Sequence, residues 1–132
     1  MSIPLNVIIL AAGKGTRMKS DLPKVLHPLA GKPLLSHVLD AADRLAPERI
    51  CVVYGHGGEV LPQAVGRPDL AWAKQEPQLG TGHAVQQALP HLNPDALCLI
   101  LYGDVPLTRT ETLQEMVLIA QSGAIALLIG LA

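Results

Sequence analysis

A glycine-rich segment with several cations is the part of this sequence best suited to chemistry. It runs from Leu10 to Lys24 (LAAGKGTRMKSDLPK) and directly follows an apolar stretch. Glycines let the backbone come close to a phosphate group and turn its N–H groups inward, while cations neutralise the charge. A plain turn between a strand and a helix is the simpler interpretation. The four basic residues within eleven positions favour a phosphate-binding loop: Lys14, Arg17, Lys19 and Lys24.

The two best-known phosphate loops do not fit this segment. A Walker loop needs a glycine, four further residues, and then Gly-Lys followed by Ser or Thr. Here Gly15 follows Lys14, and Ile8 stands where the first glycine would be. The dinucleotide fingerprint fails as well, because its third glycine would be Met18. These mismatches argue against a P-loop NTPase and against an ordinary NAD enzyme.

A single acid follows the most apolar stretch of the chain. Asp104 comes two residues after the stretch 97–102 (LCLILY), and the carboxyl ends of parallel strands share one edge of a sheet. A hard carboxylate at that edge can hold Mg²⁺ against phosphate oxygens. The alternative is that Asp104 is a solvated loop residue or a helix cap. Sugar transferases of related architecture usually have two acids in an Asp-x-Asp pattern, whereas Asp104-Val-Pro has only one. Its pairing with the glycine-rich loop favours the metal-binding interpretation.

A third segment, KQEPQLGTGHA at 74–84, precedes an expected helix. Gly80 and Thr81 would direct N–H groups and a hydroxyl into the same crevice. Gln75 offers both a donor and an acceptor, which suits the edge of a nucleobase. Thr81 could instead be a simple N-cap. The five histidines show no metal-ligand spacing, so we expect surface or capping roles for most of them; only His83 lies close to one of these loops.

The elements that must position these segments alternate in type along the chain. Apolar stretches predict strands at 6–12, 50–54, 70–74, 97–102 and 124–131. Helical spacing predicts helices at 33–45, 58–65, 81–89 and 108–121. The alternation predicts an α/β fold with a mostly parallel sheet between helices. The last apolar stretch ends next to Ala132 with nothing to cover it, so we expect a truncated chain whose bare strand favours self-association.

Composition excludes several other classes of protein. The 132 residues are 49% hydrophobic and 16% charged, which predicts one folded domain. A net charge of −1 and 2% aromatic residues leave no basic or stacking surface for nucleic acid. The longest apolar run, 96–102, has seven residues, whereas a membrane span needs about 20. The first residues, MSIPLN, lack the basic flank of a signal peptide, which predicts a cytoplasmic protein. Cys51 and Cys98 lie in apolar stretches, and we expect two buried thiols.

These motifs resemble those of a known family. The pattern LAAGxGTRM, followed by Pro23-Lys24, resembles the signature of nucleoside-diphosphate-sugar pyrophosphorylases. The segments SDLPKVLHPLAGKPL, VVYGHGG, QLGTGHAVQQA and LYGDVPL extend the match. Together they resemble the N-terminal uridylyltransferase domain of the bacterial bifunctional N-acetylglucosamine-1-phosphate uridylyltransferase/glucosamine-1-phosphate acetyltransferase. The resemblance covers essentially the whole chain and implies a Rossmann-like, GT-A-like nucleotidyltransferase fold that is incomplete at its C-terminus.

The resemblance also implies roles for individual residues. One group would contact the uridine nucleotide: Leu10, Ala11, Ala12, Gly13, Gly15 and Thr16. A second group would recognise uracil: Gln75, Gly80 and Thr81. A third group would contact the ribose, the sugar and the metal: Tyr102, Gly103 and Asp104. Arg17 would face the pyrophosphate, Lys24 would contact the phosphates, and Asp104 would bind Mg²⁺.

By the same resemblance, the reaction joins UTP and N-acetylglucosamine 1-phosphate to give UDP-N-acetylglucosamine and pyrophosphate, in a family that is trimeric. The family's second metal ligand, its sugar contacts and its β-helix acetyltransferase domain would lie beyond residue 132, so we expect this chain to be inactive alone. Two alternatives stay open. One is another nucleotidyltransferase of this fold, of the molybdopterin or isoprenoid-precursor type, which would share the first loop but not LGTGHA with YGDVPL. The other is a non-catalytic fragment that binds nucleotide.

Overall fold

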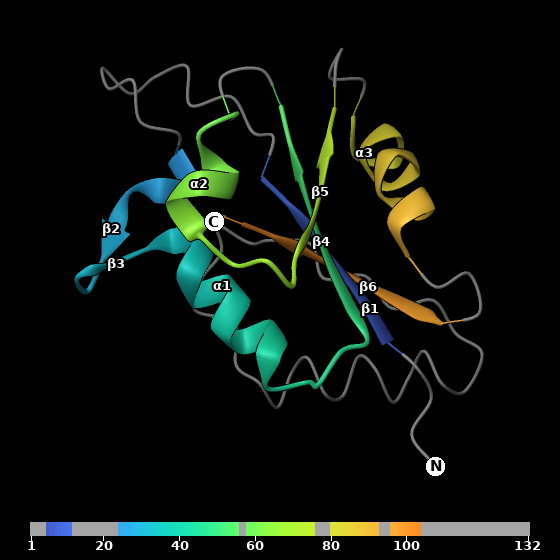
Figure 1. Ribbon diagram of the computed structural model, residues 1–132, viewed down its shortest axis with the longest axis horizontal. Helices are drawn as coiled ribbons and strands as arrows, with labels where there is room; N and C mark the ends of the chain where they lie inside the picture. The colour runs from blue at the N-terminus through green and yellow to red at the C-terminus, as the bar shows by residue number, and fades with distance from the viewer. Residues whose placement is uncertain (1–4, 12–23, 56–57, 76–79, 93–95, 104–132) are drawn as a thin grey trace.

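Four parallel strands form a sheet at the centre of the computed structural model, which describes residues 5–11, 24–55, 58–75, 80–92 and 96–103 (Figure 1). The strands are β1 (Leu5–Leu10), β4 (Arg49–Tyr54), β5 (Ala71–Lys74) and β6 (Leu97–Tyr102). Their order is β5-β4-β1-β6, so β1 lies inside the sheet with a parallel neighbour on each side. This arrangement explains why residues 7–10 of β1 form an unbroken apolar run, since both faces of the strand are covered.

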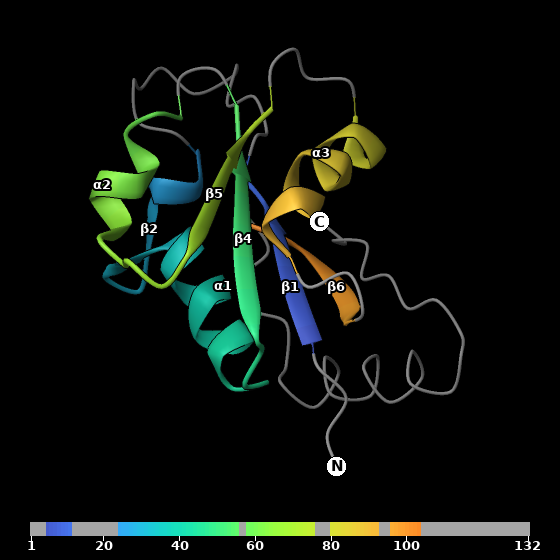
Figure 2. The same cartoon turned by 45° about the vertical axis from the view of Figure 1, so that its right-hand side comes forward.

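Helices cover both faces of the sheet. On one face, Val7 and Ile9 of β1 pack in a core with residues of α1 (Leu34–Asp43) and α2 (Leu61–Val65). On the other face, Ile8 packs with Ala84 and Ala88 of α3 (Thr81–Ala88). Figure 2 shows the two layers of helices on opposite sides of the strands. Successive residues of a strand point to opposite faces, so β1 contributes to both cores.

Local sequence explains where two of the helices begin. Pro33 is the N-cap of α1, and the buried residues Leu35, Val38, Leu39 and Ala42 follow at helical spacing. In α2, Pro62 lies within the first turn, where the missing N–H has no intrahelical partner to lose. The short helix expected at 58–65 is therefore present, although it begins at Leu61.

Several small elements are not predicted by periodicity. The 3-10 turns η1 (Lys24–Leu26) and η2 (Leu89–His91) flank longer elements. Between η1 and α1, β2 (Pro28–Leu29) pairs with β3 (Lys32–Pro33) in an antiparallel hairpin. Its two turn residues, Ala30 and Gly31, have φ of 54° and 79°. This left-handed backbone is the one that a tight two-residue hairpin turn requires.

The α/β class and the parallel sheet are confirmed, and the strand predicted at 97–102 matches β6 residue for residue. The bounds of the other predicted elements differ from the observed ones by up to three residues at an end: β1 and β4 begin one residue earlier than predicted, and the remaining differences shorten the element. The elements expected at 108–121 and 124–131 lie outside the described residues. Within the described part of the chain, no helix has the length and apolar character needed to cross a membrane.

The expectation of two buried thiols is wrong for one of them. Cys51 is buried in β4, and this burial raises the pKa of its thiol to about 11. Cys98 is exposed, and its Sγ lies 3.8 Å from Nδ2 of Asn6 on the neighbouring strand. It belongs to β6, the outer strand of the sheet that the structure describes, and α3 packs mainly over β4, β1 and β5. An apolar run therefore predicts burial better at Cys51 than at Cys98.

Candidate functional site

Three backbone hydrogen bonds hold the carboxyl ends of the four strands together. The N–H of Gly103 donates to the carbonyl of Leu10 at 2.9 Å, and the N–H of Ala11 donates to the carbonyl of Val53 at 2.8 Å. The N–H of Gln75, directly after β5, donates to the carbonyl of Tyr54 at 2.7 Å. Each bond extends a parallel ladder just beyond its strand. The segments selected from the sequence as candidates therefore begin at one edge of the sheet.

The order of the strands places a topological switch point at this edge. The chain proceeds from β1 to β4 and β5 on one side, and then returns past β1 to form β6 on the other side. In open α/β sheets, ligands bind in the crevice outside the carboxyl ends of the strands at such a reversal. In Figures 1 and 2 the ends of β1 and β6 lie side by side. The most favourable position for a ligand is thus next to Leu10 and Tyr102.

Neighbouring atoms leave little room for a side chain on Gly103 at this edge. A Cβ on this residue would lie 3.1 Å from Cγ1 of Val25, 3.3 Å from the carbonyl oxygen of Leu10 and 3.5 Å from Cβ of Ala11. Val25 is buried and belongs to η1, whose first residue is Lys24. The same close packing therefore joins the end of β6, the end of β1 and the turn that carries Lys24.

Gln75 lies in a polar cluster at the end of β5. Its side chain is only 3% exposed, and its Nε2 donates to the carbonyl of Gly80 at 2.9 Å. The same Nε2 lies 3.1 Å from Nδ1 of His83, and Nε2 of His83 lies 3.2 Å from Nε2 of Gln87. Gly80 has φ of 99°, a left-handed value that favours glycine. The Gly80 carbonyl that accepts from Gln75 also accepts the N–H of Ala84 at 3.1 Å, so it is held by the first turn of α3 as well.

Gly80, and not Thr81, is the N-cap of α3. The alternative interpretation of Thr81 as a cap is therefore wrong, because Thr81 is the first helical residue. Its backbone joins the polar cluster to the helix that packs on the sheet.

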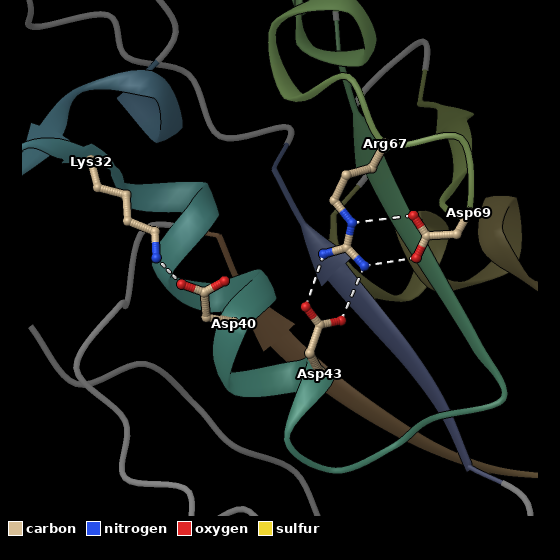
Figure 3. A network of polar contacts seen from close by, with 5 residues as sticks. All are labelled: Lys32, Asp40, Asp43, Arg67 and Asp69. Atoms are coloured by element: carbon tan, nitrogen blue, oxygen red, sulfur yellow. Dashed lines mark hydrogen bonds and ion pairs between the residues drawn. The ribbon is translucent and has the colours of Figure 1, made fainter.

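Ion pairs elsewhere have a structural role. Arg67, between α2 and β5, contacts Asp43 at the end of α1 at 3.0 Å and Asp69 at 2.7 Å (Figure 3). The hydrogen bonds that Arg67 donates to Asp69 and Asp43 raise the pKa of Arg67, and they lower the pKa of Asp69. This cluster precedes β4 and β5, at the edge of the sheet opposite to the candidate site.

Two further ion pairs join neighbouring elements. Lys32 of β3 pairs with Asp40 of α1, which attaches the hairpin to the helix (Figure 3). At the carboxyl end of β5, Lys74 pairs with Glu59 at 2.9 Å. The second pair lies next to Gln75 in the sequence and helps to hold the end of β5.

The structure brings part of the predicted site together. The described residues of that site are Leu10, Ala11, Lys24, Gln75, Gly80, Thr81, Tyr102 and Gly103. Others lie outside the described residues: Ala12, Gly13, Gly15, Thr16, Arg17 and Asp104. In the described ranges, no group of three or more His, Cys, Asp or Glu side chains could hold a metal ion. Sequence reasoning missed the contact between His83 and Gln75, and the packing of Val25 on Gly103.

Comparison with known proteins agrees with this geometry. Residues 7–129 match the family described as "MobA-like NTP transferase domain". The chain belongs to this family. This MobA-like NTP transferase domain is also 66% identical, over 124 residues, to "Bifunctional protein GlmU" of Azoarcus sp. (strain BH72). That alignment covers 94% of this chain but 27% of the relative, so the chain spans about a quarter of the relative's length. The family resemblance predicted from the motifs is confirmed.

Solved structures support the same fold. The crystal structure of Rv0371c from Mycobacterium tuberculosis H37Rv aligns with a TM-score of 0.80 at 20% identity, over 92% of this chain and 63% of that one. A structure of the same protein in complex with manganese aligns with a TM-score of 0.75 at 21% identity, over 90% of this chain and 60% of that one. At these identities the likeness shows that the MobA-like domain shares their fold.

Proposed function

We propose that this nucleotidyltransferase domain serves uridylyl transfer, in which N-acetylglucosamine 1-phosphate attacks the α-phosphorus of UTP to give UDP-N-acetylglucosamine and pyrophosphate. One observation carries the proposal. The bond from the Gly103 N–H to the Leu10 carbonyl joins the two strand ends whose motifs resemble the uridylyltransferase signature. High identity to a GlmU protein over nearly the whole chain supports the choice of this reaction within the family.

The base of UTP would bind beside β5. Gln75 presents a buried carboxamide, and Gly80 and Thr81 begin the neighbouring helix. The sugars of the nucleotide would lie near Tyr102 and Gly103 at the end of β6. This assignment follows the resemblance of these positions to the family's uracil and ribose contacts.

The phosphates would bind at the loop that follows β1. Ala12, Gly13, Gly15 and Thr16 would supply backbone N–H groups, and Arg17 and Lys24 would supply positive charge. The packing of Val25 against Gly103 supports the assignment of Lys24, because it attaches η1 to the strand ends.

A divalent cation, Mg²⁺ in our proposal, would be held by Asp104 together with phosphate oxygens and water. The donor chemistry fits, because Mg²⁺ commonly takes one or two protein carboxylates and completes its shell with phosphate and water oxygens. When bound, the ion would neutralise charge that develops on the phosphates. Asp104 follows Gly103 directly in the sequence, and Gly103 lies at the switch point of the sheet. The manganese complex of the similarly folded Rv0371c supports a role for a divalent ion.

The reaction needs no general base from the protein. The nucleophile is already an anionic phosphate, so catalysis consists of holding two reactants in line and stabilising charge in the transition state. Lys24 and Arg17 would do this through their cations, and the glycine-rich loop through its N–H groups. This chemistry agrees with candidate segments that carry cations, glycines and one acid.

The proposal is tested by nucleotide binding to the purified 132-residue chain. Thermal shift with UTP, CTP, GTP and ATP in the presence of Mg²⁺ should show stabilisation, greatest with UTP. A preference for CTP or GTP would indicate another nucleotidyltransferase of the fold and refute uridylyl transfer. Absence of stabilisation by every nucleotide would refute nucleotide binding altogether.

Turnover would need residues that the relatives carry in the remaining three quarters of their length. We propose that this chain alone has negligible transferase activity, that a trimer forms only in the longer protein, and that the 124–131 segment promotes self-association. Pyrophosphate release from UTP, Mg²⁺ and N-acetylglucosamine 1-phosphate measures the first point. Release by the 132-residue chain at the rate of a complete uridylyltransferase would contradict it.

A further inference from the structure

His83 belongs to the polar cluster at the end of β5, but it has no role in the proposed reaction. It lies in the first turn of α3, half-buried, with Nδ1 3.1 Å from Nε2 of Gln75. We infer that His83 is a positioning residue that fixes which end of the Gln75 carboxamide faces the nucleobase, and thereby selects uracil over cytosine. This inference rests on the proposed function, in which Gln75 contacts the base.

The carbonyl of Gly80 determines how the Gln75 carboxamide is turned. A carbonyl oxygen only accepts hydrogen bonds, so the atom 2.9 Å from it must be the amide nitrogen. The reverse orientation would bring two oxygens to this distance in a site where Gln75 is 97% buried. Burial away from water makes such a conflict costly. The nitrogen of Gln75 therefore faces Gly80.

His83 must then accept the second hydrogen of the same nitrogen. An acceptor at Nδ1 requires a neutral imidazole whose proton is on Nε2. Nε2 of His83 lies 3.2 Å from Nε2 of Gln87. The nitrogen and oxygen of a glutamine carboxamide exchange places when the amide is rotated by half a turn, and in the rotated form the Nε2–H of His83 donates to the oxygen of Gln87. With both hydrogens of Gln75 Nε2 engaged, the free end of its carboxamide is the oxygen Oε1.

An oxygen that cannot exchange places with its nitrogen discriminates between pyrimidines. Uracil has an N–H donor at N3, whereas cytosine has a lone pair there. In this proposal Gln75 faces N3 of the base. A Gln75 that could turn freely would satisfy either base there, but a fixed oxygen facing N3 accepts a hydrogen bond only from uracil. The position of the His83 ring is itself set by packing, because Ala84 and Ala88 of α3 are buried against the sheet. Selectivity would thus come from a histidine that need not touch the nucleotide.

The first test needs no nucleotide. Long-range ¹H–¹⁵N correlation spectra of the 132-residue chain near pH 8 report the tautomer of each imidazole. The resonances of His83, assigned by comparison with a His83→Asn variant, should show protonated Nε2 and unprotonated Nδ1. A proton on Nδ1 would overturn the inference.

The second test measures selectivity. The ratio of UTP to CTP affinity, from calorimetric titration with Mg²⁺, should fall about three- to tenfold in His83→Leu, the range expected for loss of one orienting hydrogen bond. His83→Asn should restore most of the ratio, because the Asn oxygen stands the same number of bonds from Cα as Nδ1 does. Gln86→Leu, an exposed change on the same helix, is the matched control and should leave the ratio unchanged.

The outcomes separate the two proposals. A wild-type chain that binds neither nucleotide, or binds both equally, refutes the proposed base site and with it the inference. A wild-type chain that prefers UTP, with His83→Leu equally selective, refutes the inference alone. Circular dichroism of each variant shows whether the fold is retained, and His83→Asn carries the comparison if His83→Leu unfolds.

Discussion

Substitution of Gly103 by alanine tests the close packing that joins the strand ends. The new Cβ would lie 3.1 Å from Cγ1 of Val25 and 3.3 Å from the carbonyl oxygen of Leu10. Both distances are shorter than ordinary carbon contacts, and the second involves backbone that is fixed by the Gly103–Leu10 hydrogen bond. Overpacking of this kind costs about 1–3 kcal/mol. We expect Gly103→Ala to lower the free energy of unfolding by about 1–2 kcal/mol and to weaken UTP binding.

A double-mutant cycle assigns this cost to its source. Val25→Ala removes two buried methyl carbons and should cost about 1–2 kcal/mol by itself. If Val25 supplies most of the clash, the double variant Gly103→Ala/Val25→Ala should lose less stability than the two single variants together. Its free energy of unfolding should be about 1 kcal/mol higher than the value expected from adding the two single losses. The contact with Leu10 remains, so the rescue should be partial.

Urea unfolding followed by circular dichroism measures these differences. Gly82→Ala is the matched control, because Gly82 lies in α3 and its added Cβ would meet nothing within 4 Å. Alanine at this helical position should keep or raise stability, by up to about 1 kcal/mol. Gly103→Ala as stable as the wild-type chain, or strictly additive with Val25→Ala, would refute the argument for close packing.

Three further predictions concern single side chains. Within a complete uridylyltransferase that carries this sequence, Lys24→Ala should lower transfer by about a hundredfold or more with an unchanged circular dichroism spectrum, whereas a loss under threefold would exclude the proposed role. Arg67 lowers the pKa of Asp69 in the folded chain. The ion pair between them should therefore stabilise the fold above about pH 4, the ordinary pKa of Asp, and this stabilisation should be lost as the pH falls through the lowered pKa of Asp69. The difference in urea midpoint between wild type and Arg67→Ala should therefore shrink from pH 7 to pH 2, and a constant difference would contradict this. A thiol reagent should modify the exposed Cys98 quickly in the folded chain. Cys51 is buried and its pKa is raised to about 11, so it should react only after unfolding. Mass spectrometry of the labelled peptides measures the extent of modification at each cysteine, and equal rates in the folded chain would contradict this.

The main elements could be predicted because their signals are local. The strand at 97–102 is a continuous apolar run, and α1 begins after a proline and repeats its apolar residues at helical spacing. The hairpin of β2 and β3 escaped prediction, since two-residue strands have no periodicity to detect. Burial of Cys98 was wrongly predicted because an apolar run does not tell which strand lies at the edge of the described sheet. Periodicity thus predicts an element better than it predicts what covers it.

That the candidate segments begin at neighbouring strand ends could be predicted, but their contacts could not. Parallel topology alone brings Leu10, Gln75 and Gly103 to one edge, and the hydrogen bonds between strand ends agree. The orientation of Gln75 depends on the carbonyl of Gly80, a residue with a left-handed φ whose carbonyl also accepts the N–H of Ala84. No spacing rule in the sequence specifies that angle, although a glycine before an expected helix permits it.

The two glycines show why such contacts need a structure. A Cβ on Gly80 would meet nothing within 4 Å, so a side chain there is opposed by backbone strain alone. Gly103 is not at positive φ, and a side chain there is opposed by neighbouring atoms. In the first case a substitution would strain the backbone next to the carbonyl that accepts from Gln75. In the second it would push β6 away from β1. The same residue type therefore controls the orientation of the proposed base contact at one position and the spacing of the strand ends at the other.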